Sequence, residues 1–289
     1  MSAPRGIDHL VLPVCDLDAA RATYSGLGFT CTPEAFHPFG TKNFLVQLQG
    51  AFLEVLAVHD RGLYPPQGPE DFSFPRFNDG FLARLGEGFS MLVMDSRDPG
   101  ADRASFLDAG LKVHAPFSFG RDAVLPDGSS ARVGFDLTFV SDPGLPDCGF
   151  FTCRQQHTPE LFWKPDYQRH ANTAHSVRSV VLAGEGWTQH LAFLAGFLGV
   201  EPAIANDHAR FKTARGDVIV CEPAFADALF GYKVAGEGMR LAGYEVGVAD
   251  LAAAADILAR NGIAHVAGAN GRLCVDPAAS HRVAIAFAA

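Results

Sequence analysis

The chain has 289 residues, more than the roughly 100–200 of one typical domain, so one large or two ordinary domains are expected. Hydrophobic residues make up 48% of the chain and charged residues 19%, as in globular proteins with a sizeable core. The 23 basic and 32 acidic residues give a net charge of −9, which disfavours nucleic acid or an anionic membrane as a partner.

No apolar run approaches the ~20 residues that span a bilayer, and the N-terminus lacks an apolar signal region. The six cysteines are scattered without a CxxC pair, which is typical of reduced thiols. We therefore expect a soluble, cytoplasmic protein. The 24 phenylalanines either fill the core or line an apolar ligand cavity.

The first predicted element is a strand at residues 7–14, an apolar and β-branched run. Asp16 then offers a helix N-cap, and apolar residues recur at helical spacing as far as Gly28. A glycine followed by a large apolar residue ends the helix and returns the chain to extended structure. Three further strands are predicted at residues 29–32, 43–49 and 52–58.

The same order of strand, helix and closing glycine occurs four times along the chain. The distance from the start of the strand to the glycine is 21, 21, 22 and 18 residues, measured from Ile7 to Gly28, Phe89 to Gly110, Val177 to Gly199 and Tyr244 to Gly262. Chance rarely preserves such a spacing, so we infer an internal repeat. With short extended runs after each helix, the pattern predicts an α+β fold of four βαβββ modules in two halves, with curved, mostly antiparallel sheets.

Two segments interrupt the repeat. Residues 60–88 are rich in Pro, Gly and Phe, and we interpret them as a long surface loop that covers a cavity mouth. Residues 158–174 are polar and rich in turn-forming residues, and we place the boundary between the two halves there. The predicted domains are therefore residues 1–165, with the candidate active cup, and residues 174–289, a degenerate copy.

The opening module resembles that of the vicinal-oxygen-chelate superfamily, in its glyoxalase-like domain branch. The resemblance rests on His9 in the first strand, Val-Cys-Asp-Leu-Asp-Ala-Ala at residues 14–20, Tyr-x-x-Leu-Gly-Phe at 24–29 and Phe-Leu-Glu-Val-Leu at 52–56. It implies the fold of the glyoxalase, bleomycin-resistance and extradiol-dioxygenase proteins, in which two modules form a cupped sheet around a divalent metal or a ligand.

His9 and Glu54 are the strongest candidate pair. Period-two alternation places Ile7, His9 and Val11 on one strand face, and Phe52, Glu54 and Leu56 on another. Glu54 lies in a run with no other charge, and a buried carboxylate costs several kcal/mol unless it is partnered. The resemblance implies that these strands are neighbours, so both side chains would meet in the cup. They would then be ligands for Zn, Fe, Mn or Ni, or alternatively a metal-free His–Glu pair.

The second module offers no obvious ligands, since Met91 aligns with His9, and Thr152 or Cys153 falls near the Glu54 position. We expect the set of metal ligands to be completed by Gln155, His157 or Glu160, or by water. We assign His157 as a third metal ligand and, with Glu54, as a catalytic group. The competing interpretation of Thr158-Pro159-Glu160 is the start of a helix, with Thr158 as the N-cap, Pro159 at the first position and Glu160 in the first turn.

Three further residues are expected to contact substrate: His37 at the cavity rim, Arg154 and Gln155. The competing interpretation of Arg154 is an ion pair at the surface. Asn43 flanks the Gly-Thr turn, and a role in that turn accounts for it. Cys153 lies in an apolar run that indicates burial rather than activation.

These residues and the resemblance predict a divalent-metal-dependent lyase, isomerase or dioxygenase acting on a small oxygen-rich organic substrate. The alternative is a non-enzymatic, metal-free protein that binds a drug-type small molecule in a Phe-lined cavity, so enzyme status stays open. We expect a small-molecule substrate or ligand as the partner, no nucleic acid and no membrane, and allow for a homodimer.

Overall fold

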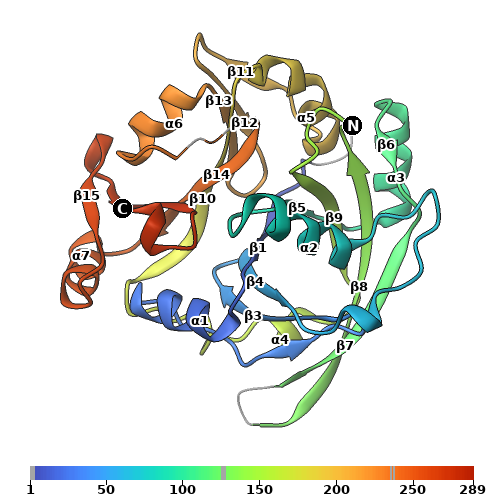
Figure 1. The fold of residues 1–289 in the computed structure, drawn as a ribbon, viewed down its shortest axis with the longest axis horizontal. Helices are drawn as coiled ribbons and strands as arrows, with labels where there is room; N and C mark the ends of the chain where they lie inside the picture. Colours follow the sequence, from blue (N-terminus) through green and yellow to red (C-terminus); the bar gives the residue numbers. More distant parts are fainter. Residues whose placement is uncertain (1–3, 125–127, 235, 237) are drawn as a thin grey trace.

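The computed structural model describes residues 4–124, 128–234, 236 and 238–289. Its strands form two sheets, one from the first half of the chain and one from the second (Figure 1). The first sheet contains β1 (Ile7–Pro13), β2 (Ala35–Phe36), β3 (Thr41–Gln47), β4 (Phe52–Val58), β5 (Met91–Asp95), β6 (Lys112–Val113), β7 (Phe117–Val124), β8 (Ser130–Ser141) and β9 (Gly149–Gln155). The second contains β10 (Ala174–Ala183), β11 (Pro202–Ile204), β12 (His208–Lys212), β13 (Asp217–Cys221), β14 (Arg240–Val248), β15 (His265–Ala267), β16 (Leu273–Val275) and β17 (Ala284–Ala288).

Both sheets follow one plan. The strand order is β2-β3-β4-β1-β5-β9-β8-β6 in the first, with β7 paired to β8, and β11-β12-β13-β10-β14-β17-β16-β15 in the second. In each module the first strand pairs in parallel with the last, and two modules meet at an antiparallel central pair, β1–β5 or β10–β14. This topology confirms the predicted α+β fold of four βαβββ modules in two halves.

Helices connect the strands of each module. They are α1 (Leu17–Gly26), α3 (Pro99–Asp108), α5 (Leu191–Leu198), which follows the short helix η2 (Trp187–His190), and α7 (Leu251–Arg260). Asp16 and Asp250 cap α1 and α7 by accepting hydrogen bonds from backbone N–H groups in the first turn. Each closing glycine of the repeat has a positive φ, between 63° and 90°, at Gly28, Gly110, Gly199 and Gly262. A side chain strains this backbone conformation, which explains why glycine recurs there.

Several predicted boundaries are wrong. Residues 29–32 form no strand, and the second strand of the module is instead the short β2. The segment expected to be a loop contains η1 (Arg61–Leu63) and the helix α2 (Phe74–Leu85). Its proline and glycine content suggested a loop, but Pro75 lies in the first turn of α2, where its missing N–H costs nothing.

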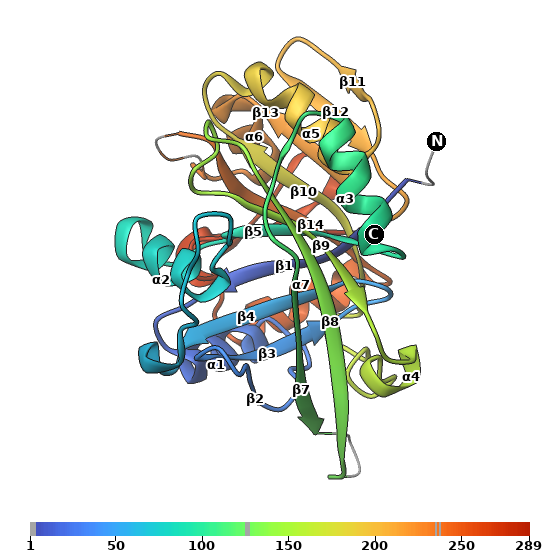
Figure 2. The ribbon, with the colours of Figure 1, turned by 90° about the vertical axis from the view of Figure 1, so that its right-hand side faces the viewer.

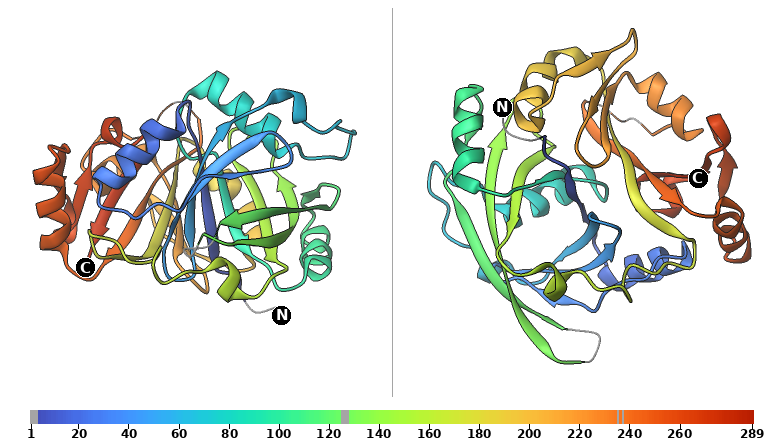
Figure 3. Two further views of the ribbon diagram at one scale, coloured as in Figure 1. Left: turned by 90° about the horizontal axis from the view of Figure 1, so that it is seen from below. Right: turned by 180° about the vertical axis from the view of Figure 1, so that it is seen from behind.

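One core joins the two sheets. Side chains on one face of each sheet, such as Leu10 and Val180, belong to a single buried cluster. This cluster also includes side chains of α1, α3, α5 and α7. Phe197 of α5 packs against Phe106 of α3 and Phe150 of β9, with ring centroids 5.9 and 5.4 Å apart. The end of α7 lies beside the end of α1, where Asn261 donates a hydrogen bond to the Gly26 carbonyl (Figure 3). The division into two domains therefore remains a prediction, because the halves share their largest core.

The opposite faces of the two sheets differ. On the first sheet, Val11, Met91 and Val93 lie in a second cluster rich in phenylalanine. On the second sheet, the corresponding face carries mostly small residues and is covered by α6 (Pro223–Phe230), whose Phe230 is fully buried. Helix α6 thus covers part of this face, while Ser179, Glu245 and Arg272 line a separate hollow of the second half.

Two elements cover the first cup. The hairpin of β7 and β8 extends beyond the body of the sheet (Figure 2), and β7 contacts β2 from the other edge, so the sheet curls on itself. Helix α2 is fixed by Asn78, which donates to the Phe74 carbonyl and accepts from the Ser90 hydroxyl, both bonds being buried. This anchoring places Phe74 over the cup. No helix in the described ranges is long and apolar enough to cross a membrane.

We predict that Phe197→Ala destabilises the whole chain by about 3–5 kcal/mol, because it opens a cavity where α5 meets the first half. The measurement is urea unfolding followed by circular dichroism and by tryptophan fluorescence. Phe36→Ala, at a half-exposed phenylalanine, is the matched control and should cost little. Two separated transitions in the wild type would contradict a shared core.

Candidate functional site

The first cup contains a cavity with walls made mainly of aromatic rings. Its volume is about 40 Å³, on a scale where one water molecule needs roughly 10–15 Å³. The polar residues that line it are His9, His37, Asn43, Glu54, Arg121 and Cys153, and the apolar ones include Phe39, Phe52, Phe74, Phe119, Phe135, Phe151 and Phe162. A few converging polar groups in an apolar hollow are typical of a small-molecule site.

Glu54 is the carboxylate around which the polar groups of the cavity gather. It lies on β4, where the parallel register sets it beside Val11 of β1, and only 6% of it is exposed. Asn43 of β3 donates a hydrogen bond of 2.5 Å from Nδ2 to Oε1 of Glu54. Because an unpartnered buried carboxylate is very costly, this donor stabilises the charged form inside the sheet.

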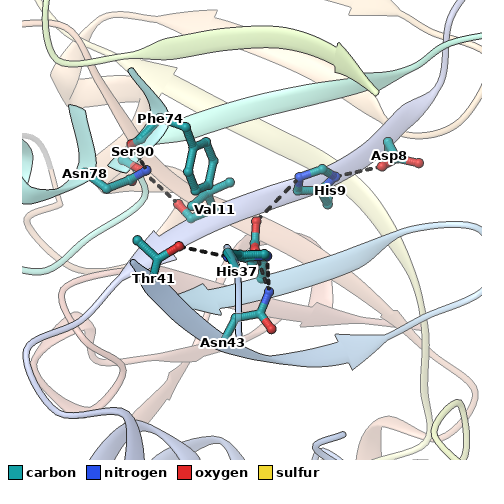
Figure 4. A network of polar contacts seen from close by, with 10 residues as sticks. Asp8, His9, Val11, His37, Thr41, Asn43, Phe74, Asn78 and Ser90 are labelled. Carbon is teal, nitrogen blue, oxygen red and sulfur yellow. Dashed lines mark hydrogen bonds and ion pairs between the residues drawn. The ribbon is translucent and has the colours of Figure 1, made fainter. Parts of the chain in front are cut away.

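His9 approaches Glu54 from the neighbouring strand. Its Nε2 lies 3.7 Å from Oε2 of Glu54, and its Nδ1 lies 2.7 Å from Oδ2 of Asp8. The ring stacks on Phe52 with a centroid distance of 4.4 Å. The Asp8 carboxylate and the Phe52 ring therefore hold the imidazole with Nε2 toward the cavity, as Figure 4 shows for His9 and Asp8.

His37 is the second imidazole at this carboxylate. Its Nδ1 lies 2.8 Å from the Thr41 hydroxyl, and its Nε2 lies 3.5 Å from Oε1 of Glu54. Burial holds the pKa of His37 well below its usual value, and the charges of Arg121 and His9 lower it further. The ring is therefore neutral near pH 7, and its contact with Glu54 is not an ion pair. Thr41, His37 and Asn43 come from adjacent positions of the β2–β3 hairpin (Figure 4).

Arg121 brings a positive charge into the same cavity. It follows Phe117 and Phe119 on the inward face of β7 and is 7% exposed. Its Nε has no hydrogen-bond partner among the described residues, and its Nη1 makes only a 3.5 Å contact with the Asp122 carbonyl. Burial lowers the pKa of this guanidinium, and the negative charge of Glu54 opposes that shift.

Cys153 lines the cavity but is not activated. Burial raises the pKa of the Cys153 thiol well above its usual value, and the carboxylates of Asp8, Glu54 and Asp136 raise it further. The thiol therefore stays protonated and is a poor nucleophile. The predicted burial of Cys153 is confirmed.

The structure brings together only part of the predicted site. His9, Glu54 and His37 meet, whereas Ile7 packs in the other core because a register shift lies between it and His9. His157, Arg154 and Gln155 do not line the cavity. His157 packs against Phe135 and Phe162 with Nδ1 at Gly134, Arg154 is half-exposed 3.6 Å from Asp136, and Gln155 ends β9 opposite Phe135.

Three residues of the candidate site were not predicted from the sequence. Asn43 was assigned to turn chemistry, but it lies inside β3 and is buried against Glu54. Asp8 precedes His9 in a strand, where neighbouring side chains normally point apart, so its contact with His9 was not expected. For Arg121 the alternation Phe117-Ser-Phe119-Gly-Arg121 is a usable signal, because it places the arginine on the same face as two apolar rings.

The donor set does not make a full metal site as it is arranged. In the second module, Val93 pairs with Phe151 as Val11 pairs with Glu54 in the first, so apolar side chains stand where further ligands would be needed. The described ranges contain no group of three or more His, Cys, Asp or Glu side chains arranged to hold a metal ion. A buried guanidinium in the same cavity also opposes a second cation.

Comparisons with known proteins place the chain among related folds. A family model described as a glyoxalase-like domain matches residues 7–198. A hypothetical protein from Staphylococcus aureus superposes with a TM-score of 0.70 at 12% identity, covering 98% of this chain and 99% of that chain. A Mn(II)-bound glyoxalase from Novosphingobium aromaticivorans gives 0.58 at 12% identity, with 99% and 82% covered. A mutant of 4-hydroxymandelate synthase from Streptomyces coelicolor gives 0.56 at 14% identity, with 91% and 77% covered.

At these identities the structural likeness shows the fold alone. No curated protein sequence matches the chain.

We predict that Asn43→Asp destabilises the chain by about 2–4 kcal/mol near neutral pH, because it sets a second carboxylate against Glu54 in a buried site. The double variant Asn43→Asp/Glu54→Gln should recover most of this loss, since it exchanges donor and acceptor. Chemical unfolding of the four proteins measures the coupling. An equal effect of Asn43→Asp in both backgrounds would show that the two side chains do not interact.

The neutral state of His37 predicts a pH dependence of stability. Because its pKa is lowered in the folded chain, its contribution is complete above its ordinary pKa of about 6.5 and is lost as the pH falls below that value. The free energy of unfolding should therefore fall less steeply between about pH 6.5 and pH 5 in His37→Asn than in the wild type. His59→Asn, at an exposed histidine, is the control and should keep the wild-type slope. Parallel curves for wild type and His37→Asn would contradict the prediction.

Proposed function

Because the chain belongs to the glyoxalase-like domain family, we propose that the cavity of its first sheet is the active site of an enzyme. The substrate is a small, oxygen-rich organic molecule, and Glu54 is the group that moves a proton. The observation that carries this proposal is the position of Glu54, a buried carboxylate directed into an aromatic hollow and held by Asn43, His9 and His37.

The surroundings of Glu54 suit a general base. Asn43 fixes the carboxylate through Oε1, and Oε2 faces His9 at 3.7 Å, which is longer than a hydrogen bond. Oε2 is therefore the oxygen free to accept a proton from a carbon next to a carbonyl group. The Nε2 atoms of His9 and His37 face the same carboxylate, and one that carries a proton would stabilise negative charge developing on a substrate oxygen bound beside it. Lyases and isomerases share this proton transfer.

The aromatic walls exclude water from the reacting groups. Phe52 and Phe151 flank His9, and Phe39 and Phe119 flank His37, with ring centroids between 4.4 and 5.5 Å from each imidazole. Electrostatic interactions are stronger in such a low-dielectric site than in water. Asn43 also presents a buried Oδ1 that has no partner in the described part of the chain, and it can accept a hydrogen bond from the substrate.

A metal-dependent reaction is the second candidate. It is favoured by Asp8, which contacts the Nδ1 atom of His9 as a carboxylate does behind many metal-bound histidines. His9 and Glu54 would hold Zn, Fe, Mn or Ni, and the ion would polarise vicinal oxygens of the substrate. The remaining ligands would have to come from the substrate or from water. His157 would need a movement of β9 to take part.

A protein that only binds a small molecule is the third candidate. Its support is the number of phenylalanine rings around the cavity. Such a protein needs no carboxylate at the position of Glu54, so this residue distinguishes binding from catalysis.

We predict that Glu54→Gln keeps the fold and abolishes turnover. The change keeps the shape of the side chain and removes a buried charge, so stability should stay within about 1 kcal/mol or rise. A library of small carbonyl compounds is screened for conversion by wild type and variant, by NMR of the reaction mixture. Glu245→Gln, at a buried carboxylate of the second sheet paired with Arg272, is the matched control and should leave turnover intact.

A second variant, His9→Ala, tests the role of metal. Elemental analysis of wild type and His9→Ala, after incubation with each of the four metals, should show no stoichiometric ion in either if the reaction is metal-free. A stoichiometric ion in the wild type that is lost in His9→Ala would establish the second candidate. Wild-type turnover retained by Glu54→Gln would contradict both enzymatic candidates.

A further inference from the structure

We propose that Arg121 is the anchor for a single carboxylate group of the ligand, so that the substrate is a small monocarboxylic acid. The inference rests on the proposed use of the first cavity and adds the chemical class of the molecule that enters it. Neither Glu54 nor the aromatic walls require a charged substrate, whereas Arg121 does.

The first step concerns the counter-ion that Arg121 lacks. A guanidinium carries five N–H donors in a fixed plane and stays charged in proteins. Arg121 is 93% shielded from solvent, yet no carboxylate lies within 4.0 Å of it in the described part of the chain, and its Nε is unpartnered. The other buried arginine of the described residues, Arg5, has the same exposure but bonds Asp102, Ser105 and the Phe197 carbonyl.

The second step concerns the role that the neighbouring acid already has. Glu54 raises the pKa of Arg121, so the two charges act on each other, but Glu54 is bonded to Asn43 and faces the two imidazoles instead. The β7–β8 hairpin thus carries a cation to the cavity and leaves it without a direct counter-ion. A buried charge of this kind is stabilised when a ligand supplies the partner.

The third step concerns the kind of anion. Carboxylates match the planar fork of a guanidinium and bring one negative charge. Arg121 is the one arginine or lysine that lines the cavity in the described ranges, so a doubly charged phosphate would keep an unbalanced charge among phenylalanine rings. The Phe135 ring centroid lies 6.0 Å from Cζ of the guanidinium, and the other phenylalanine rings of the cavity would contact the apolar body of an acid.

The geometry also assigns an orientation. Arg121 and Asn43 lie together where the main cavity meets a neighbouring hollow that Thr32, Gln47 and Lys164 also line. A carboxylate on Arg121 places the adjoining carbon of the acid between the guanidinium and Glu54. The base then faces the carbon that the carboxyl group makes more acidic, in agreement with the proton transfer proposed above.

The test is a thermal-shift titration of the full chain with isobutyrate and phenylacetate, each against its neutral amide at matched ionic strength. The acids should raise the Tm of the wild type and the amides should not. Arg121→Met should weaken the response to the acids about tenfold to a hundredfold, the loss of one or two charged hydrogen bonds. Arg121→Gln, which keeps a polar head group without the charge, should weaken the response to the acids to a similar degree.

Arg132→Met is the matched control, because Arg132 lies on the paired strand with an exposed side chain and should leave the titration unchanged. The ligand-free Arg121→Met protein should also be at least as stable as the wild type, since it loses a buried charge without a partner. Inorganic phosphate is a further probe and should raise the Tm less than the acids do.

Glu54→Gln separates this inference from the proposed function, since it should still bind the acids while losing turnover. Equal responses to acids and amides, no response of the wild type, an unchanged response of Arg121→Met, a destabilised ligand-free Arg121→Met or a stronger response to phosphate would each overturn the assignment. A variant Glu54→Gln that binds the acids and keeps full turnover would overturn the proposed function and leave the role of Arg121 intact.

Discussion

The buried carboxylate of Glu54 is the constraint on which the candidate site depends. A charge in the middle of an apolar strand is tolerated only with polar partners around it, and each neighbouring strand supplies one. Asn43 reaches it from β3 and His9 from β1, while His37 reaches it from the β2–β3 hairpin. Asp8 and Thr41 then fix the two imidazoles from behind. The polar side of the cup is thus a connected network with one acid at its centre.

The repeated modules have diverged in what they present to their cups. The first module carries the polar network, and the second sets apolar residues such as Met91 and Phe151 against it. In the second sheet, α6 covers part of the corresponding face. Since the backs of both sheets share one core, the second half also supports the walls of the first. Repetition of the module therefore provides the scaffold, and divergence of the side chains gives the two cups different linings.

Two departures from the module plan reach the cavity. The second module has an additional strand, β7, which forms a hairpin with β8 and closes the cup toward β2. Its inward face adds two aromatic rings and the guanidinium of Arg121. Helix α2, inserted between the two modules, adds Phe74 from the opposite direction. Insertions within and between the modules thus shape the cavity, together with the repeated plan of the strands.

The sequence by itself determined the modules. Alternating apolar strands, an aspartate at the start of three of the helices and a glycine of positive φ at the end of each are local features, and local features repeat at readable spacings. It also determined that Glu54 is buried and that His9 is its neighbour, because the resemblance fixes which strands pair. Asn43, Asp8 and Arg121 could not be assigned in this way. Their roles depend on strand register, on a local irregularity of β1 and on the path of a hairpin across the cup, which arise from contacts between residues far apart in the chain. His157 follows the end of β9 and is close to the site along the chain, yet it lies outside the cavity. Only tertiary packing decides which side chains near the end of that strand point inward.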